Sequence, residues 1–369
     1  MWFATERGLH RYDGYRFIVH RHEKNNPRSI SGDDVNVLYF DSKDRFWVGT
    51  VSEGLNLFDR TTSTFRRFRH NSRDPHSLSS DSITCVYEDK KGRIWVGTWT
   101  GGLNLLDPAT GRCEQYQPIR DVPSDREPIQ RSVTSMLQDR SGTFWVTSWN
   151  GLNKFEPETG RFHFLPNRKF NGMRKDSITS RYIYTVYEAG DGGIWIGTYE
   201  GLNWYHPKTR QLGIHVYDAS FIGHPAANAV RCIMEGPDGR IWCGSEEGGG
   251  IQMFDPVTRR TERMVHDMRD PFSLSDNRVR QMYRDSFGCY WIATLGGGVD
   301  FYNPKVMNFN LYQPEIGAGK HHGVRAMKLD SKGTFWVSYH MGFGTFDLVT
   351  KSFSWHPFSD RLFCWRGPS

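Results

Sequence analysis

The stretch from Ile83 to Asp107, ITCVYEDKKGRIWVGTWTGGLNLLD, decides the fold. It divides into three short runs rich in aromatic and β-branched residues, a composition typical of β-strands. Gly92 and the pair Gly101-Gly102 separate the runs, and glycines in such places mark hairpin turns. A fourth short run, Arg112 to Tyr116, follows the turn Pro108-Ala109-Thr110-Gly111. The stretch therefore predicts a meander of four antiparallel strands.

The tryptophan of the second run recurs along the whole chain at intervals of 45 to 50 residues, in the local motifs WFAT, WVGT, WVGT, WVTS, WIGT, WCGS, WIAT and WVSY. The series is Trp2, Trp47, Trp95, Trp145, Trp195, Trp242, Trp291 and Trp336. Repeats of this period indicate a propeller or a solenoid. Four short strands without helical periodicity favour the propeller. We predict an all-β fold, a β-propeller of four-stranded antiparallel blades.

The recurring tryptophan is interpreted as structural. One blade is too small to bury its own faces, so each blade must stack on its neighbours. A large indole in the same strand of every blade supplies apolar area for that stacking, and its N–H needs a hydrogen-bond partner. The residue two positions later is small, as at Gly49 and Gly97, which predicts close approach of neighbouring backbone.

Two ring closures are compatible with the repeat count. In the preferred one, seven blades form a propeller over residues 1–314, and an eighth motif at 320–358 starts a second propeller. In the other, the eighth motif is an eighth blade of the same ring. The chain begins inside a second strand, so the first strand of blade 1 is expected to be missing. We expect a fragment of a longer protein, without a signal peptide, whose residues 359–369 are an unstructured or truncated tail.

Composition narrows the classes of function. The chain of 369 residues has 47 basic and 41 acidic residues and a net charge of +6, spread without a concentrated basic run, which argues against nucleic-acid binding. The mild excess would also suit acidic ligands such as uronic-acid or sulfated sugars. No apolar run is long enough to span a membrane.

The six cysteines include no C-x-x-C or zinc-type spacing, and neither a metal site nor a cofactor is expected. Cys85 and Cys232 are interpreted as small buried residues in the first strands of their blades. We align them with Asn36, Thr134 and Tyr184 of other repeats. A disulfide framework is not expected.

These motifs resemble a known family. The core W-(V/I)-G-T-x-x-G-L-N-x-(F/L/Y)-D, the lead-in (V/I)-Y-E-D-x-x-G-x-(I/F)-W and the linker D-P-x-S-L-S are similar to two-component regulator propeller repeats. The resemblance extends from Trp2 to about Pro357. Such repeats form the periplasmic sensor region of hybrid two-component histidine kinases, mainly in Bacteroidetes.

The resemblance implies a periplasmic, carbohydrate-sensing module. It implies that an oligosaccharide or another small polar ligand binds and that the signal passes to a histidine kinase and its phosphorelay. The partners it implies are a second propeller, a β-sandwich and kinase modules in the full-length protein, which would form a homodimer. Kinase activity would belong to those other modules, so this chain is not expected to be an enzyme.

Ligand contacts are predicted on one face of the propeller. The loops from second to third strand and the loops between blades are expected to emerge there. Aromatic side chains next to arginine, asparagine and glutamate would give a sugar a flat platform and hydrogen-bonding groups. The candidate ligand-binding residues are Trp99, Trp149, Asn150, Tyr199, Glu200, Arg7, Arg73 and Arg174. An alternative interpretation is that the aromatic residues only cover blade edges.

Two other functions stay open. Some propellers are polysaccharide lyases or glycosidases, and the acids Glu53, Glu200 and Glu246 fall on the predicted loop face. Paired carboxylates could perform acid–base chemistry on a sugar, but no particular pair is singled out as catalytic. A protein-interaction scaffold is the third hypothesis, because the fold alone does not separate these functions.

Overall fold

The fold is built from short antiparallel strands. The computed structural model describes residues 2–5, 7–12, 17–117, 131–165, 177–215, 228–270, 272–285, 287–297, 299–305, 308–312, 324–329, 334–339, 342–347 and 352–357. These residues form 31 β-strands. A helix with the length and apolarity needed to cross a membrane is absent from this part of the chain. The all-β prediction is confirmed.

The strands form eight sheets, here called blades 1 to 8 in chain order. Blade 1 contains β1 (Trp2–Thr5), β2 (Gly8–Tyr12) and β3 (Phe17–His20). Blade 2 contains β4 (Val35–Phe40), β5 (Phe46–Thr50), β6 (Leu55–Asp59) and β7 (Thr64–Phe68). Blade 3 contains β8 (Ile83–Glu88), β9 (Ile94–Thr98), β10 (Leu103–Leu106) and β11 (Cys113–Tyr116). Blade 4 contains β12 (Ser135–Gln138), β13 (Phe144–Ser148), β14 (Gly151–Glu156) and β15 (Arg161–Phe164).

The second half of the chain repeats the pattern. Blade 5 contains β16 (Ile183–Glu188), β17 (Ile194–Thr198), β18 (Gly201–His206) and β19 (Gln211–His215). Blade 6 contains β20 (Cys232–Glu235), β21 (Ile241–Ser245), β22 (Gly250–Phe254) and β23 (Thr261–Met264). Blade 7 contains β24 (Val279–Arg284), β25 (Tyr290–Thr294), β26 (Val299–Asn303) and β27 (Asn308–Tyr312). Blade 8 contains β28 (Val324–Leu329), β29 (Phe335–Tyr339), β30 (Gly342–Asp347) and β31 (Ser352–Pro357).

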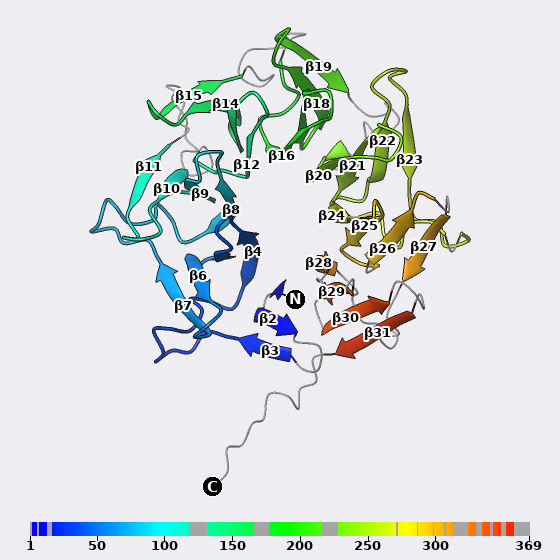
Figure 1. Ribbon diagram of the computed structural model, residues 1–369. Helices are drawn as coiled ribbons and strands as arrows, with labels where there is room; N and C mark the ends of the chain where they lie inside the picture. Colours follow the sequence, from blue (N-terminus) through cyan, green and yellow to red (C-terminus); the bar gives the residue numbers. More distant parts are fainter. Residues whose placement is uncertain are drawn as a thin grey trace.

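The blades follow one another around a ring (Figure 1). In blades 2 to 8 the first strand lies nearest the centre and the fourth at the rim. Strands β28 and β29 contact β1, and β28 also contacts β25, so blade 8 sits between blades 7 and 1. This arrangement differs from the preferred seven-bladed closure, because the eighth motif packs into the same ring. The boundaries 1–314, 320–358 and 359–369 stay predictions, since residues 313–323 and 358–369 lie outside the described part.

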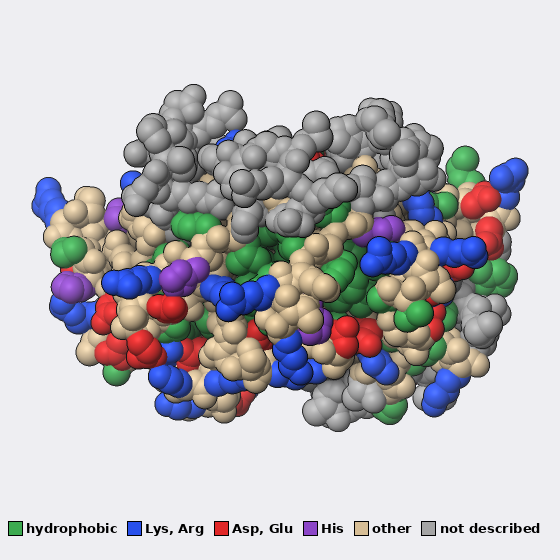
Figure 2. Space-filling model, turned by 90° about the horizontal axis from the view of Figure 1, so that it is seen from above, with side chains coloured by type: hydrophobic (Ala, Val, Ile, Leu, Met, Phe, Trp, Pro, Cys, Tyr) green, Lys and Arg blue, Asp and Glu red, His purple; other side chains and the backbone are tan. Residues whose placement is uncertain are grey.

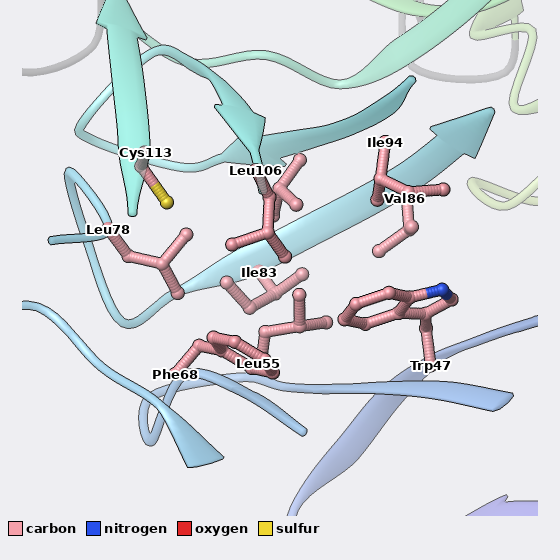
Figure 3. Packing of buried hydrophobic residues seen from close by; sticks show 10 residues of the cluster. Trp47, Leu55, Phe68, Leu78, Ile83, Val86, Ile94, Leu106 and Cys113 are labelled. Atoms are coloured by element: carbon pink, nitrogen blue, oxygen red, sulfur yellow. The ribbon is translucent and has the colours of Figure 1, made fainter. Parts of the chain in front are cut away.

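The core lies in layers between neighbouring blades. The indole of Trp47 in β5 reaches across to blade 3, where its neighbours come from β8, β9 and β10 (Figure 3). The residues of this layer are Trp47, Leu55, Phe68, Leu78, Ile83, Val86, Ile94, Val96, Leu106 and Cys113. Burying one large apolar side chain stabilises the fold by about 1.5–3 kcal/mol relative to leaving it exposed. Each layer is therefore a small core of its own.

A buried aspartate accepts a hydrogen bond from the repeated tryptophan in four blades. Trp95 Nε1 donates to Asp89 Oδ2 at 2.9 Å, and Trp47 Nε1 donates to Asp41 Oδ2 at 2.8 Å. Blades 4 and 7 repeat the bond. Burial raises the pKa of Asp89, but hydrogen bonds from Trp95 and Arg93 outweigh burial and hold it below its usual value. The aspartate therefore stays ionised and satisfies the indole N–H.

The small residue after the tryptophan is needed for contact between blades. A methyl group added at Gly97 would lie 2.5 Å from Cys85 Sγ in the same blade and 2.8 Å from Val133 Cγ1, ahead of the first strand of blade 4. Gly49 would meet Ile83 of the next blade at 2.7 Å. The predicted close approach is thus observed at these two positions.

Replacing Gly97 by valine should lower the free energy of unfolding by about 1–3 kcal/mol, because the branched side chain overpacks this contact. Urea denaturation followed by tryptophan fluorescence measures the change. Ala109→Val, which adds similar bulk at an exposed turn, is the matched control and should change stability by less than about 0.5 kcal/mol. Equal effects of the two substitutions would contradict the close-packing argument.

Candidate functional site

A pocket of about 360 Å³ opens at the centre of the ring. Its wall comes from the inner strands of blades 2 to 7 and from residues just after the second strands of blades 2, 3, 4 and 6. The lining residues are Asn36, Val51, Ser82, Ile83, Thr84, Trp99, Thr134, Trp149, Tyr184, Arg231, Glu246 and Arg280. Six blades therefore contribute to one cavity.

A β-bulge places one side chain of each inner strand in this pocket. In blade 3 the pairing with β9 shifts between Ile83 and Cys85, which leaves Thr84 out of the ladder. The same shift occurs at Asn36, Tyr184 and Arg280. A bulge leaves its extra residue unpaired and re-aims the side chain, as is frequent next to functional sites.

In blades 4 and 6 the residue just before the inner strand takes the place of the bulged residue. The amide of Arg231 donates to Gly244 O at 2.8 Å, while Cys232 pairs with the same glycine. Thr134 is related in the same way to Thr147. The sequence alignment of Cys85 and Cys232 with Asn36, Thr134 and Tyr184 was therefore wrong by one position. The counterparts of those three residues are Thr84, Arg231 and Arg280, which stand at the same distance before the repeated tryptophan.

One half of the pocket wall is closed by hydrogen bonds between blades. Asn36 Nδ2 donates to Ile83 O at 3.3 Å, and Thr84 Oγ1 donates to Val133 O at 2.5 Å. Thr134 Oγ1 continues the series by donating to Ile183 O at 2.7 Å. These small polar side chains are used in holding neighbouring blades together.

The other half carries charge. Arg231 Nε donates to Glu246 Oε2 at 2.8 Å, and Arg280 forms an ion pair with the other oxygen of Glu246. The Arg231 guanidinium also lies 5.5 Å from the centre of the Tyr184 ring. Burial raises the pKa of Tyr184, so the phenol is neutral. Two arginines against one glutamate give this side a net positive charge, which favours an anionic group.

Two tryptophans form an apolar platform at the pocket. Trp99 and Trp149 follow the second strands of adjacent blades, and their ring centres lie 4.5 Å apart in an edge-to-face arrangement. The amide of Trp99 donates to Ser82 O, and that of Trp149 donates to Ser132 Oγ, both at 2.9 Å. Trp149 Nε1 is buried and finds no acceptor among the described residues. A ligand acceptor could satisfy this N–H.

The other candidates from blades 4 and 5 lie close by but outside the lining. Tyr199 contacts Tyr182 at 6.4 Å between ring centres, and Tyr182 contacts Trp149 at 5.3 Å. Glu200 is half-buried and accepts a hydrogen bond from Ser180 Oγ at 3.5 Å. Asn150 is buried, with 1% of its surface exposed. The structure therefore brings Trp99 and Trp149 together at the pocket and leaves these three residues around it.

Of the candidate arginines that the structure describes, neither Arg73 nor Arg7 lines the pocket. Arg73 is exposed in the loop between blades 2 and 3, which runs along the rim because Cys113 N of the outer strand donates to His76 O at 2.7 Å. Arg7 is exposed in the turn between β1 and β2. Arg174 lies outside the described residues. The first part of the loop between blades 2 and 3 follows the outer strand, so Arg73 is not a lining residue, and its contact with a ligand stays a prediction.

Sequence reasoning missed Tyr184, Arg231 and Arg280 as pocket residues, and it named Glu246 only as a loop acid. The signal was present in the repeat: the residue after the first apolar position of the inner strand varies from blade to blade. No group of His, Cys, Asp or Glu suited to a metal ion occurs among the described residues. The visible side of the ring mixes basic and acidic side chains without a single-sign patch (Figure 2).

A family model agrees with the repeat. The model "Two component regulator propeller" matches residues 77–100, 177–200, 225–247 and 273–296. The predicted resemblance is confirmed: the chain carries two component regulator propeller repeats. A search of curated proteins finds no match to the sequence.

Solved structures with the same fold have low sequence identity. The extracellular domain of a putative hybrid two component system from B. thetaiotaomicron is 17% identical, with a TM-score of 0.50 over 97% of this chain and 52% of that one. Virginiamycin B lyase from Staphylococcus aureus is 12% identical, with a TM-score of 0.55 over 83% of this chain and 92% of that one. PorZ of Porphyromonas gingivalis is 13% identical, with a TM-score of 0.55 over 93% and 57%. The chain thus spans about half of the first of these structures, and these similarities establish a propeller fold.

Proposed function

We propose that the chain is the extracytoplasmic sensor propeller of a hybrid two-component system and that it binds an acidic oligosaccharide in the central pocket. The observation that carries the proposal is the combination of an aromatic platform with the Arg231–Glu246–Arg280 cluster in one cavity. Sugar rings stack on aromatic faces, and carboxylate or sulfate groups pair with arginine. The pocket offers both within one site.

The rest of the sensing apparatus belongs to the same proposal. A periplasmic location, a second propeller, a β-sandwich, a kinase with its phosphorelay and a homodimer of the full-length form are what the repeat family implies. They are supported by the matches to two component regulator propeller repeats. The chain itself would supply ligand recognition and would leave phosphotransfer to other modules.

Binding without turnover fits this pocket better than catalysis. A glycosidase needs two carboxyl groups on either side of the scissile bond. Among the described lining residues Glu246 is the one carboxylate, and two arginines hold it. Glu53 instead pairs with Arg69 in another part of blade 2.

The first experiment is a thermal-shift titration with acidic and neutral oligosaccharides, followed by product analysis. A ligand at about 100 times its dissociation constant stabilises the folded state by roughly 2.7 kcal/mol. A shift with intact acidic sugar supports the proposal. Sugar consumed would favour an enzyme. A protein captured by the chain, with no sugar binding, would favour the scaffold.

Arg280→Gln should weaken binding of an acidic ligand by about 10- to 100-fold, because a hydrogen bond to a charged group contributes about 1.5–3 kcal/mol. Binding of a neutral ligand should change little. Arg73→Gln, at the exposed rim, is the matched control and should leave both affinities unchanged. Calorimetric titration measures each constant. An equal loss with the two variants would place the ligand elsewhere.

A further inference from the structure

Blade 5 lacks two side chains that cover the repeated tryptophan in blades 2 and 3. In blade 3 the turn before the second strand supplies Asp89, which accepts from Trp95 Nε1, and Arg93, whose guanidinium lies 5.4 Å from the Trp95 ring. Arg93 Nε also donates to Asp89 Oδ2 at 2.7 Å. At the corresponding positions, blade 5 has Ala189 and Gly193.

A hollow of about 800 Å³ lies where those side chains are missing. Ala189 and Trp195 both line it. Trp195 keeps the packing of its counterparts: its ring centre lies 5.6 Å from that of Phe254 in blade 6, just as Trp95 lies 5.2 Å from Phe155 in blade 4. The Trp195 side chain is therefore in place, and its usual cover is absent.

The Trp195 indole is nine-tenths buried yet has an unused donor. Its exposed fraction is 5%. In four other blades the aspartate at the position of Ala189 accepts from the indole N–H. No described residue accepts a hydrogen bond from Trp195 Nε1. In those blades the indole N–H faces the residue at the Ala189 position. Since Ala189 lines the hollow, the same orientation directs the Trp195 N–H into the hollow.

The lining of the hollow is acidic. Arg240 is the lining cation, and it pairs with Asp238 at 2.5 Å and with Glu262 at 2.6 Å. Three further lining carboxylates, Asp191, Glu235 and Asp255, accept backbone hydrogen bonds but form no ion pair among the described residues. Arg140 of blade 4 binds the carbonyl oxygens of Ala189 and Gly190 but is not a lining residue.

Loss of the aspartate in blade 6 has a different outcome. Gly236 takes its position there, and a methyl group added to that glycine would lie 2.3 Å from Trp242 Nε1. The backbone therefore packs directly against Trp242. The accessible hollow is a property of the blade 5 turn, where alanine and glycine replace both covering side chains.

We propose that this hollow binds a guanidinium group. The group would stack on the Trp195 ring in the way that the Arg93 guanidinium stacks on Trp95. A guanidinium stacks on an indole and pairs with carboxylates in one plane, and the chain already uses this arrangement at Trp47 and Trp95. The three lining carboxylates that form no ion pair supply the negative charge for it. An arginine in a peptide also brings a carbonyl oxygen, which could accept from the Trp195 N–H. This site is independent of the central pocket.

The test follows the indole N–H signals by NMR during titration, with the Trp195 signal assigned from the spectrum of Trp195→Phe. The probes are agmatine, a short peptide with one arginine, and the same peptide with citrulline in place of arginine. A shift of the Trp195 signal with the arginine peptide but not with the uncharged citrulline peptide is expected. An equal shift with both peptides, or no shift with either guanidinium probe, would overturn the proposal. Agmatine binding would show that a small free guanidinium compound is sufficient, and binding of the peptide alone would identify a protein side chain as the source.

Two variants give opposite expectations. Ala189→Asp restores the acceptor beside Trp195 and leaves room for the ligand, so guanidinium affinity should rise about tenfold. Adding Gly193→Arg to that variant rebuilds the blade 3 arrangement, and binding should be lost. Thr143→Arg, which introduces the same residue in the equivalent turn of blade 4, should leave binding unchanged. Thermal melting checks that each variant is folded. If the double variant fails to fold, the comparison of the arginine and citrulline peptides still shows whether the hollow binds a guanidinium group.

Discussion

Trp95→Ala is expected to lower the free energy of unfolding by about 3–5 kcal/mol, the range for removing a large aromatic side chain from a core. Trp95 is fully buried between blades 3 and 4, and its ring centre lies 5.4 Å from that of Phe144. The substitution also removes the hydrogen bond to Asp89 and leaves a buried carboxylate without one of its donors. An unsatisfied buried polar group adds about 1–3 kcal/mol to the cost.

Urea denaturation monitored by circular dichroism measures this loss. Trp99→Ala is the matched control, because it removes the same side chain from a half-buried position four residues further along the chain. The control should lose much less stability and should affect ligand binding instead. Similar losses for the two variants would contradict the structural role assigned to the repeated tryptophan.

Asp300→Asn should stabilise the protein at pH 8. Asp300 is fully buried at a position where blades 2 to 5 have asparagine. In blade 3, Asn104 Nδ2 donates to Val96 O at 3.2 Å. A carboxylate has no such donor, and Asp300 Oδ1 has no partner among the described residues. Its other oxygen accepts from the backbone and hydroxyl of Ser275, each at 3.1 Å.

The effect depends on pH in a defined direction. Burial raises the pKa of Asp300 from 3.8 to about 7, with a smaller contribution from the nearby Asp276, while the Ser275 hydrogen bonds act against the rise. An acid whose pKa is raised in the folded state does not lower the free energy of unfolding below pH 3.8, where it is protonated in both the folded and the unfolded state. The cost grows between pH 3.8 and 7, because ionisation favours the unfolded chain, and is complete above pH 7. Above pH 7 the ionisation of Asp300 lowers the free energy of unfolding by roughly 4 kcal/mol at most.

Thermal melting of wild type and Asp300→Asn from pH 4 to pH 8 tests this dependence. The two proteins should have similar stability at pH 4, and the variant should become progressively more stable than wild type toward pH 8. Asn104→Asp places the same carboxyl group in blade 3 and should show the reverse change. A difference between wild type and Asp300→Asn that is constant across the pH range would show that ionisation of Asp300 is not the cause.

The fold could be predicted because its determinants repeat. Trp95 and its counterparts must fill the same space in every blade, so the spacing of one large residue defines both the blade and its stacking. The closure of the ring was harder to predict. It depends on contacts between β1 and the strands β28 and β29, far apart in the sequence, and the repeat pattern does not contain them.

The pocket could be predicted only in part. Trp99 and Trp149 were identified because they follow directly after an obvious strand. Arg231 and Arg280 were missed because a bulge shifts the inner strand by one residue, and the alternation of side chains then no longer tells which residue faces the centre. Arg73 lies outside the pocket lining because the loop between blades 2 and 3 begins at the rim and reaches the centre only further along the chain, at Ser82.

The bulges have an evolutionary consequence. Since the bulged residue is left out of the pairing with the next strand, its identity can change while the sheet is preserved. Asparagine, threonine, tyrosine and arginine all occupy this position in different blades. Blades 2 to 7 thus supply six such positions. Those of blades 2 to 4 also link neighbouring blades by hydrogen bonds, so the positions in blades 5 to 7 can change with less effect on the contacts between blades. Substitutions at these positions could change which ligand the pocket recognises during evolution, while the sheets that present them stay the same.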